Sequence, residues 1–297
     1  MSLMTESFRQ SGWQYEFYDD DRAAQFLQTH FPPAVIEAYD ALLPGAFKAD
    51  LFRYCVLLIM GGLYADTDVI LESNLDKLIP PSVGFMTPED IPGMTVGHAH
   101  CLWNGFLAAA PGHPFLAQTI QNVVNHIRNR YTSIDYDDML CPNPVLTVSH
   151  LKDVLFTAGP CILGASVNDV LQLHRQTTFV PGDIEIFPRQ SNHNGKEQPE
   201  SGLHQHSFNE TSSDPRLLIP GRSIILKRDF IDRFPHRFIW EEKNMVAAVT
   251  NIPDYNDRPE TLAHYGKLHD DFGIYGLNGL YKDTNRANEE IMIEIVP

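Results

Sequence analysis

The segment from residue 46 to Asp68 constrains the fold of this 297-residue sequence more than any other. Its apolar first part, residues 46–60, predicts a helix that ends at a glycine pair. A short apolar strand follows the glycines and leads directly into Asp66 and Asp68. Carboxylates at the carboxyl end of a strand lie where open α/β sheets usually bind ligands. The segment therefore predicts an α/β fold with a binding site at this edge.

Two pairs of charged residues in this segment can act together. Asp50 and Arg53 are three residues apart on the predicted helix, so they share a face. Alternate residues of a strand point the same way, so Asp66 and Asp68 can converge on one ligand. Such oxygen ligands suit Mg²⁺ or Mn²⁺. Because each pair alone is more typical of a solvated turn or a surface ion pair, the hypothesis depends on their combination.

Composition and charge narrow the class of partner. Hydrophobic residues make up 43% and charged residues 20%, as in a globular protein. The net charge of -16 disfavours nucleic acid, whose phosphates an acidic surface repels. A phosphate-containing ligand would need a local cation, namely an arginine, a helix N-terminus or a metal. No apolar run approaches the roughly 20 residues of a membrane span, so we expect membrane association only through a segment outside this chain.

The rest of the sequence alternates strands and helices, as in a layered α/β domain. We expect further strands at 13–18, 69–71, 83–86, 102–109 and 221–228, and helices at 20–30, 34–43, 113–130, 144–156 and 167–173. Residues 190–215 and 251–297 are loop-rich and are candidate lids. The four cysteines form no CxxC pair and require no disulfide, and Cys55 fits the core. The start has no signal-peptide shape, which leaves the Golgi or secretory lumen and the cytoplasm open.

Residues 50–54 and 61–68 together resemble the sugar-binding region of glycosyltransferase family 32. The family's Ala-x-x-Asp-x-x-Arg-Tyr helix, Gly-Gly-x-Tyr and Asp-x-Asp stand here without gaps, except that the alanine, Ala49, lies next to Asp50. The family includes fungal initiating and inositol-phosphoceramide mannosyltransferases, and large clostridial glucosylating toxins carry a related core. Weaker similarities occur at Trp13–Asp21, Asn104 to Phe115, Gly159-Pro160 and His264–Leu268. The family's opening Ile-Pro-Lys-Ile-Ile-His-Gln strand is absent, and its later His-His…Ser-Trp segment is reduced to residues 204–211, without the tryptophan.

The resemblance implies a GT-A type fold, with a Rossmann-like central sheet flanked by helices and a loop-rich C-terminal part. Residues 1–297 would form one catalytic domain, with a nucleotide-sugar core at 13–185 and the acceptor side at 186–297. The implied reaction moves a hexose, with retention at the anomeric carbon, from GDP-mannose or a UDP-hexose to a hydroxyl. The acceptor would be a carbohydrate, a lipid or a protein, and the cofactor Mn²⁺ or Mg²⁺.

The resemblance also assigns roles to residues. It makes Asp50, Arg53, Asp66 and Asp68 the catalytic group. The donor contacts would be Trp13, Asp50, Arg53, Tyr64, Asp66 and Asn104. The metal would be held by Asp68 and Asp66 with either His206 or His264. The alternatives are that Trp13 and Tyr64 are structural aromatics and that Asn104 is a turn residue. We expect His113 to cap the helix that begins at Pro114 rather than to take part in the chemistry.

Two other functions remain open on the sequence alone. A non-catalytic relative could bind nucleotide sugars or carbohydrates without turnover. A metal-dependent phosphohydrolase could use the same aspartates, although such enzymes usually need more acidic or histidine ligands close by than this segment contains. Turnover of a nucleotide sugar, binding without turnover, and phosphate release separate the three hypotheses.

Overall fold

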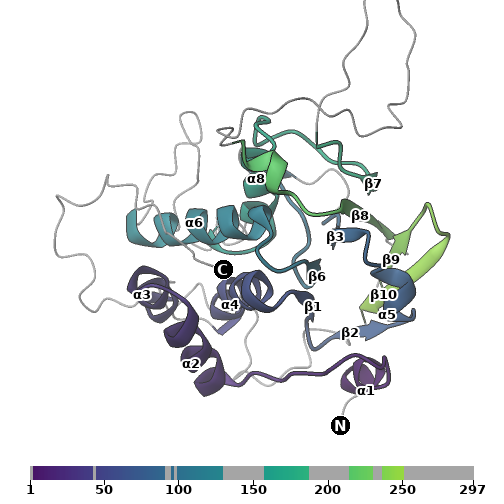
Figure 1. Ribbon diagram of the computed structural model, residues 1–297, viewed down its shortest axis with the longest axis horizontal. Helices are drawn as coiled ribbons and strands as arrows, with labels where there is room; N and C mark the ends of the chain where they lie inside the picture. Colours follow the sequence, from purple (N-terminus) through teal and green to yellow (C-terminus); the bar gives the residue numbers. More distant parts are fainter. Residues whose placement is uncertain are drawn as a thin grey trace, which may run out of the picture.

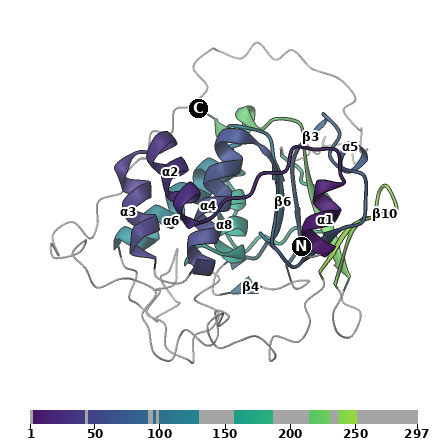
Figure 2. The ribbon, with the colours of Figure 1, turned by 90° about the horizontal axis from the view of Figure 1, so that it is seen from below.

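A curved β-sheet with most of the helices on one side forms the computed structural model (Figures 1 and 2). The structure describes residues 3–42, 45–90, 95–96, 99–129, 157–186, 214–229 and 236–250. The helices are α1 (Leu3–Arg9), α2 (Asp20–His30), α3 (Pro33–Ala41), α4 (Gly45–Met60), α5 (Leu75–Leu78), α6 (Pro114–Asn129), α8 (Pro160–Val170) and the 3-10 turn η3 (Pro215–Leu218). The strands are β1 (Gly62–Ala65), β2 (Val69–Leu71), β3 (Val83–Pro88), β4 (Thr95–Val96), β5 (Ala99–His100), β6 (Phe106–Ala109), β7 (Gly182–Asp183), β8 (Arg222–Asp229), β9 (Arg237–Trp240) and β10 (Met245–Thr250).

The strand order explains how the Asp66 turn is placed. The main sheet runs β1-β6-β3-β8-β9-β10-β2, and β7 adds to β8. Its two end strands, β1 and β2, are joined in sequence by residues 66–68 alone. A sheet whose ends are linked by so short a turn must curve, as the twist of β-sheets allows. The two carboxylates of the turn therefore lie where the ends of the sheet approach each other.

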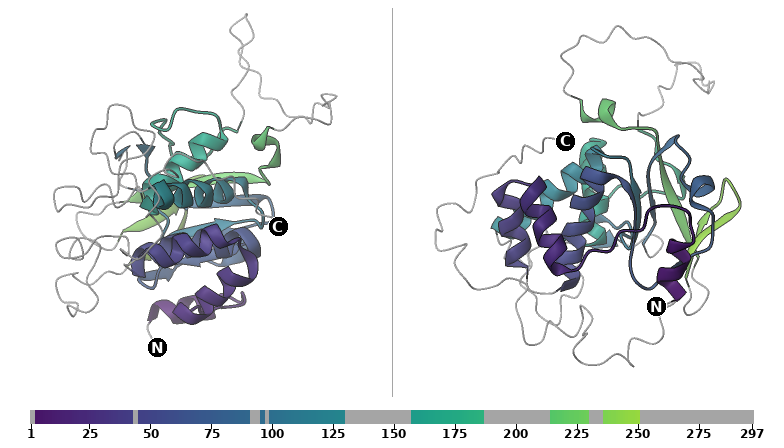
Figure 3. Two further views of the ribbon diagram at one scale, coloured as in Figure 1. Left: turned by 90° about the vertical axis from the view of Figure 1, so that its left-hand side faces the viewer. Right: turned by 60° about the horizontal axis from the view of Figure 1, so that its bottom comes forward.

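The sheet is mixed. β3 and β8 pair in parallel, and the other pairs recorded between described strands are antiparallel. The predicted α/β class is confirmed, but the described strands do not form the mostly parallel sheet that a Rossmann-like core would have. The helices α2, α3, α4, α6 and α8 lie together, and α1 and α5 lie apart from them (Figure 3).

Local sequence signals set the ends of the helices that lead to the site. Asp19 caps α2 by accepting a hydrogen bond from the Arg22 backbone N–H at 2.9 Å. Helix α4 ends at Met60 because Gly61 and Gly62 follow with φ of +65° and +100°, a conformation that glycine adopts without strain. The chain then turns back into β1. The predicted helices at 20–30, 34–43, 46–60 and 113–130 are confirmed within a few residues.

Two apolar cores hold the sheet. The larger lies among the helices and one face of the sheet, with Leu51, Tyr54 and Phe115 among its buried members. The smaller lies around β8, β9 and β10, where Trp240 and Phe238 are buried. The predicted Cys55 is fully buried in the larger core as a free thiol. Cys101 and Cys161 form a disulfide, which the spacing of the cysteines did not require.

Some predicted elements are wrong. Residues Trp13–Tyr18 are extended but form no strand, because no backbone–backbone hydrogen bond joins residues 14–18 to another described segment. The strand expected at 102–109 is shortened to β6, since Asn104 and Gly105 form a turn before it. The helix expected at 167–173 is α8, which starts earlier, at Pro160, where proline suits the first helical turn.

Other predictions fall outside the described residues. These are the helix at 144–156, the tail at 251–297 and nearly all of the loop at 190–215, of which only 214–215 are described. Among the residues that the structure describes, no helix is long and apolar enough to cross a membrane.

Buried His113 gives the fold a predicted sensitivity to acid. Its Nδ1 accepts a hydrogen bond from the Phe115 backbone N–H at 3.2 Å, which confirms the predicted helix cap, and burial lowers its pKa to about 3. The unfolded chain binds a proton here below about pH 6.5 and the folded chain does not. The free energy of unfolding should therefore fall as pH drops from about 6.5 towards 3, by up to about 1.4 kcal/mol per pH unit from this residue.

Urea unfolding at pH 7 and pH 5 checks this expectation. His113→Asn keeps a hydrogen-bond acceptor and removes the titrating group, so its loss of stability between the two pH values should be smaller than that of the wild type. His30→Asn, at the exposed end of α2, is the matched control. An equal loss in wild type and His113→Asn would contradict the assignment.

Candidate active site

The turn at residues 66–68 is anchored to the sheet at both ends. The Asp66 backbone N–H donates to the Gly105 carbonyl at 2.8 Å, and the Val69 N–H donates to the Asp66 carbonyl at 3.1 Å. Asp66 and Asp68 are half-buried and Thr67 between them is exposed. The structure thus places both carboxylates on a fixed turn at the end of β1, where Asp66 lines a cavity and Oδ1 of Asp68 is buried.

Arg53 links this turn to helix α4. Its Nη2 lies 2.9 Å from Asp50 Oδ1 and 3.4 Å from Asp66 Oδ1, and its Nε donates to the Ala49 carbonyl at 3.2 Å. Asp50 is 1% exposed and Arg53 3%, so this is a buried network. The predicted grouping of Asp50, Arg53 and Asp66 is therefore present, and the guanidinium is already bound to carboxylates of the protein itself.

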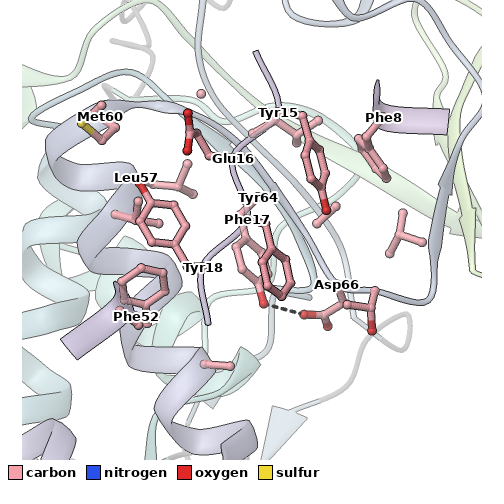
Figure 4. A pocket seen from close by; sticks show the side chains of 18 of the residues that line it. Phe8, Tyr15, Glu16, Phe17, Tyr18, Phe52, Leu57, Met60, Tyr64 and Asp66 are labelled. Carbon is pink, nitrogen blue, oxygen red and sulfur yellow. Dashed lines mark hydrogen bonds between the residues drawn. The ribbon is translucent and has the colours of Figure 1, made fainter. Parts of the chain in front are cut away.

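Tyr64 completes the first layer around Asp66. Its hydroxyl donates to Asp66 Oδ1 at 2.9 Å, and the Arg53 guanidinium lies 4.6 Å from the centre of its ring (Figure 4). Burial raises the pKa of the Tyr64 phenol well above its ordinary value, so the hydroxyl remains a hydrogen-bond donor. One oxygen of Asp66 is thereby held by both Tyr64 and Arg53.

A second layer lies behind Asp50. Buried Asn104 donates through Nδ2 to Asp50 Oδ1 at 3.0 Å and to the Tyr54 hydroxyl at 2.7 Å. The Tyr54 hydroxyl in turn donates to the Ala158 carbonyl at 3.0 Å. The sequence singled out Asn104 but gave no role to the Tyr54 hydroxyl, because a tyrosine on an apolar helix face gives no sign that its hydroxyl is used.

The backbone of Gly105 packs closely against the Asp66 carboxylate, a contact that the sequence did not reveal. A Cβ atom at this position would lie 2.5 Å from Asp66 Oδ2 and 2.6 Å from Trp103 Cζ2. The absence of a side chain therefore lets the carboxylate and the indole edge approach the backbone closely. Trp103 itself is stacked on Phe238, with ring centres 4.5 Å apart.

The site opens into a cavity of about 380 Å³ that runs along β1 and along residues 13–20. Tyr64 and Asp66 line one part of it, beside Phe17 in Figure 4. Trp13 also lines the cavity, and its indole N–H donates to Asp76 Oδ1 at 2.9 Å. The structure thus brings Trp13 into the same cavity as Asp66, although the tryptophan is also bound to the protein.

The described residues contain no cluster of three or more His, Cys, Asp or Glu side chains that could hold a metal. Asp66 and Asp68 are two hard oxygen donors, so further ligands would have to come from a substrate, from water or from other residues. His206 and His264, the two predicted histidine ligands, lie outside the described residues.

The comparisons with known proteins bear on this site directly. Residues 3–84 match the family model of the glycosyltransferase sugar-binding region containing the DXD motif. The predicted resemblance to glycosyltransferase family 32 is confirmed. An uncharacterized glycosyltransferase, L373 of Acanthamoeba polyphaga mimivirus, is 33% identical over 113 residues, which cover 38% of this chain and 43% of the relative. The residues matched by the family model, 3–84, include Asp50, Arg53, Tyr64 and Asp66.

Relatives from fungi are mannosyltransferases. The initiation-specific alpha-1,6-mannosyltransferase of Schizosaccharomyces pombe is 26% identical over 193 residues, covering 57% of this chain and 47% of the relative. Inositol phosphoceramide mannosyltransferase 1 of the same yeast is 29% identical over 124 residues, covering 41% and 35%. The enzyme class predicted from the sequence, a glycosyltransferase, is thus the class of the relatives. The matches span less than half the length of each of these relatives.

Solved structures also match this chain, and one of them is a glycosyltransferase. The PaToxG glycosyltransferase aligns with a TM-score of 0.27 and 18% identity, over 42% of this chain and 35% of that chain. A likeness at this level adds nothing to the assignment of the fold, which rests on the strand order described above.

Proposed function

We propose that this chain is a metal-dependent retaining glycosyltransferase that moves a hexose from a nucleotide-diphosphate sugar to a hydroxyl acceptor. The observation that carries the proposal is the Asp66 carboxylate, fixed by Arg53 and Tyr64 beside an open cavity. The family match and the mannosyltransferase relatives support the class of reaction. GDP-mannose and UDP-hexoses are the donors to test, and a glycan, a glycolipid or a protein would be the acceptor.

The burial of the network suggests a division of roles. Asp50 and Arg53 are almost fully buried, so we propose that they hold the turn in place and supply fixed charge beneath the donor sugar. Asp66 is more accessible, with its side chain 34% exposed, and would contact the donor itself. Tyr64 and Asn104 would keep the carboxylates of Asp66 and Asp50 oriented through their hydrogen bonds.

The chemistry of the turn fits a divalent cation. Asp66 and Asp68 offer hard oxygen ligands on one short turn, as Mg²⁺ and Mn²⁺ prefer. Asp66 Oδ2 lies against Gly105, where a side chain would displace it. When bound, the cation would neutralise the charge of the departing nucleoside diphosphate. Such a cation is needed in this proposal because the chain carries a net charge of -16 and Arg53 is already paired.

The protein's own contribution is to position the donor and to limit access of water. A hexose placed over Asp66 would lie beside the rings of Phe17 and Tyr64, and the bound donor and these rings together would limit the water that competes as acceptor. The acceptor hydroxyl would approach from the side of the leaving group. We propose a GT-A type assignment and a single catalytic domain for the chain on the family match, with His206 or His264 as a further metal ligand.

A panel of donors tests this proposal. The full chain is incubated with Mn²⁺ and with GDP-mannose, UDP-glucose or UDP-galactose, and released GDP or UDP is measured with and without simple sugar acceptors. Release that increases with an acceptor supports transfer. Binding of donors without any release would favour a non-catalytic relative, and phosphate release from a phosphomonoester would favour a phosphohydrolase.

Gly105→Ala should impair this reaction by displacing the Asp66 carboxylate. The added methyl group would meet Asp66 Oδ2 at 2.5 Å, so the carboxylate must move. We expect kcat to fall about tenfold or more, together with a stability loss of about 1–3 kcal/mol. Gly164→Ala is the control, because its methyl group would meet the His100 carbonyl instead. Gly164→Ala should lower Tm without lowering the kcat of the folded fraction, and equal kcat losses would argue against a specific role of Gly105.

A further inference from the structure

The edge of the sheet that carries Asp66 also carries a second group of charged side chains. β1 and β3 both run antiparallel to β6, and β8 runs parallel to β3, so β1, β3 and β8 end at one edge (Figure 1). Glu89 and Asp90 follow the end of β3, and Arg228 lies near the end of β8. β6 lies between β1 and β3, so their ends are two strand spacings, or about 10 Å, apart. Open α/β sheets usually bind ligands outside such ends.

Arg228 joins the members of this second group. Its Nη1 donates to Asp90 Oδ1 at 2.6 Å, its backbone N–H donates to Glu89 Oε1 at 3.0 Å, and its Nη2 lies 2.9 Å from His236 Nδ1. Glu89 and Asp90 are 6% exposed and His236 is 7% exposed. Burial and the nearby guanidinium lower the pKa of His236 to about 4, so its imidazole is neutral near pH 7. Because a buried ionic cluster adds little stability compared with apolar packing, its position at this edge favours a binding role.

The indole of Trp103 connects this cluster to the Asp66 turn. Its ring centre lies 5.4 Å from the guanidinium carbon of Arg228. Its Cζ2 and Asp66 Oδ2 both lie against Gly105, where a Cβ atom would be 2.6 Å from the first and 2.5 Å from the second. Trp103 is half-buried, and its stacking on Phe238 fixes the orientation of the ring. A partly exposed aromatic ring therefore lies between the carboxylate that would contact the donor and a cluster of buried hydrogen-bonding groups.

This combination of groups suits a sugar. A sugar ring has apolar C–H groups that pack against aromatic rings, and hydroxyls that form hydrogen bonds with carboxylates and guanidinium groups. Asp90 is paired with Arg228, but a carboxylate has about four lone-pair sites and can accept from a sugar hydroxyl as well. The acyl chain of a lipid would meet charged groups at this position and would have to desolvate them. The cluster therefore favours a carbohydrate over a lipid tail.

We propose, on the basis of the transferase function proposed above, that Trp103, Asp90 and Arg228 bind a hexose of the acceptor, which makes the acceptor a carbohydrate. This hexose would lie along Trp103, beside the donor sugar at Asp66, and Asp90 would accept from one of its hydroxyls. Another hydroxyl would attack the anomeric carbon of the donor. The new C–O bond forms as the bond from that carbon to the diphosphate oxygen breaks, and the hydroxyl proton passes to the departing diphosphate.

Acceptor kinetics of two variants test the site. The acceptor probe is methyl α-D-mannopyranoside, used with a donor that the wild type turns over. Asp90→Asn should raise the KM for the sugar about tenfold and Trp103→Phe severalfold, while donor KM and release without an acceptor stay within about twofold. A merely structural role would lower release with and without the acceptor together. Asp183→Asn breaks a 2.6 Å pair with Arg222 at the opposite end of β8, and this matched control should behave as the wild type.

Sugar binding measured without a donor separates this site from the transferase proposal. Saturation-transfer difference NMR should detect binding of methyl α-D-mannopyranoside to the full chain, and Asp90→Asn should weaken it about tenfold. Such binding in a chain that turns over no donor would overturn the transferase and support the site. Sugar KM and binding unchanged in both Asp90→Asn and Trp103→Phe would overturn the site. Transfer to a phosphatidylinositol vesicle or a serine peptide, but not to the sugar, would also overturn it.

Discussion

Asp68→Ala should reduce the release of nucleoside diphosphate from the donor by at least about 100-fold while leaving the fold intact. Asp68 is half-buried on the turn that follows β1 and, with Asp66, is one of two hard oxygen donors there. Removing it would leave the proposed cation with one carboxylate of the turn. Because the residue is half-buried and lies on a turn outside the two apolar cores, Tm should change little compared with the loss of activity.

Steady-state kinetics over a range of Mn²⁺ concentrations measures this effect. The loss in Asp68→Ala should be larger at low Mn²⁺ and partly recovered at high Mn²⁺, as expected for weakened metal binding. Glu37→Ala, which removes an exposed carboxylate from α3, should match the wild type. Activity of Asp68→Ala within twofold or threefold of the wild type would remove Asp68 from the proposed metal site.

Arg53→Ala should destabilise the protein by about 3–5 kcal/mol, which is large against the usual stability of a domain. The substitution would leave the buried Asp50 carboxylate without its 2.9 Å partner and would free Asp66 from the 3.4 Å contact. It would also remove the guanidinium from the face of Tyr64. Truncating one member of a buried ion pair is costly because the remaining charge stays desolvated.

Chemical unfolding of three variants separates charge from packing. Asp50→Asn combined with Arg53→Met removes both charges and keeps similar volume, so it should recover part of the stability lost in Arg53→Ala. Arg22→Ala breaks an exposed pair with Glu16 and should have a much smaller effect. If Arg53→Ala were no more destabilising than Arg22→Ala, the buried network would not hold the turn.

The sequence predicted the centre of the site better than its surroundings. Asp50, Arg53 and Asp66 were grouped correctly because helix spacing, the glycine pair and a short strand leave little freedom between them. The close contact of Gly105 with Asp66 could not be foreseen, since it joins two turns that lie 39 residues apart in the chain. The same holds for the Tyr54 hydroxyl, whose partners come from distant loops.

Trp13–Tyr18 shows where local patterns fail. Alternating aromatic and polar residues favour a strand, but a strand exists only when a neighbour pairs with its backbone. No described segment does so here, and the stretch remains extended beside the cavity. The sequence also could not predict which strands pair in parallel and which pair antiparallel. The order of the strands is decided by long-range packing, which the periodicity of the sequence does not encode.

Release of GDP or UDP by the wild-type chain, followed as Mn²⁺ is titrated and then removed with EDTA, tests the central claim most directly. The account predicts release from at least one nucleotide sugar that saturates with Mn²⁺, stops in EDTA and returns when Mn²⁺ is restored. Release that continues unchanged in EDTA, or bound donor that is never turned over at any Mn²⁺ concentration, would contradict it.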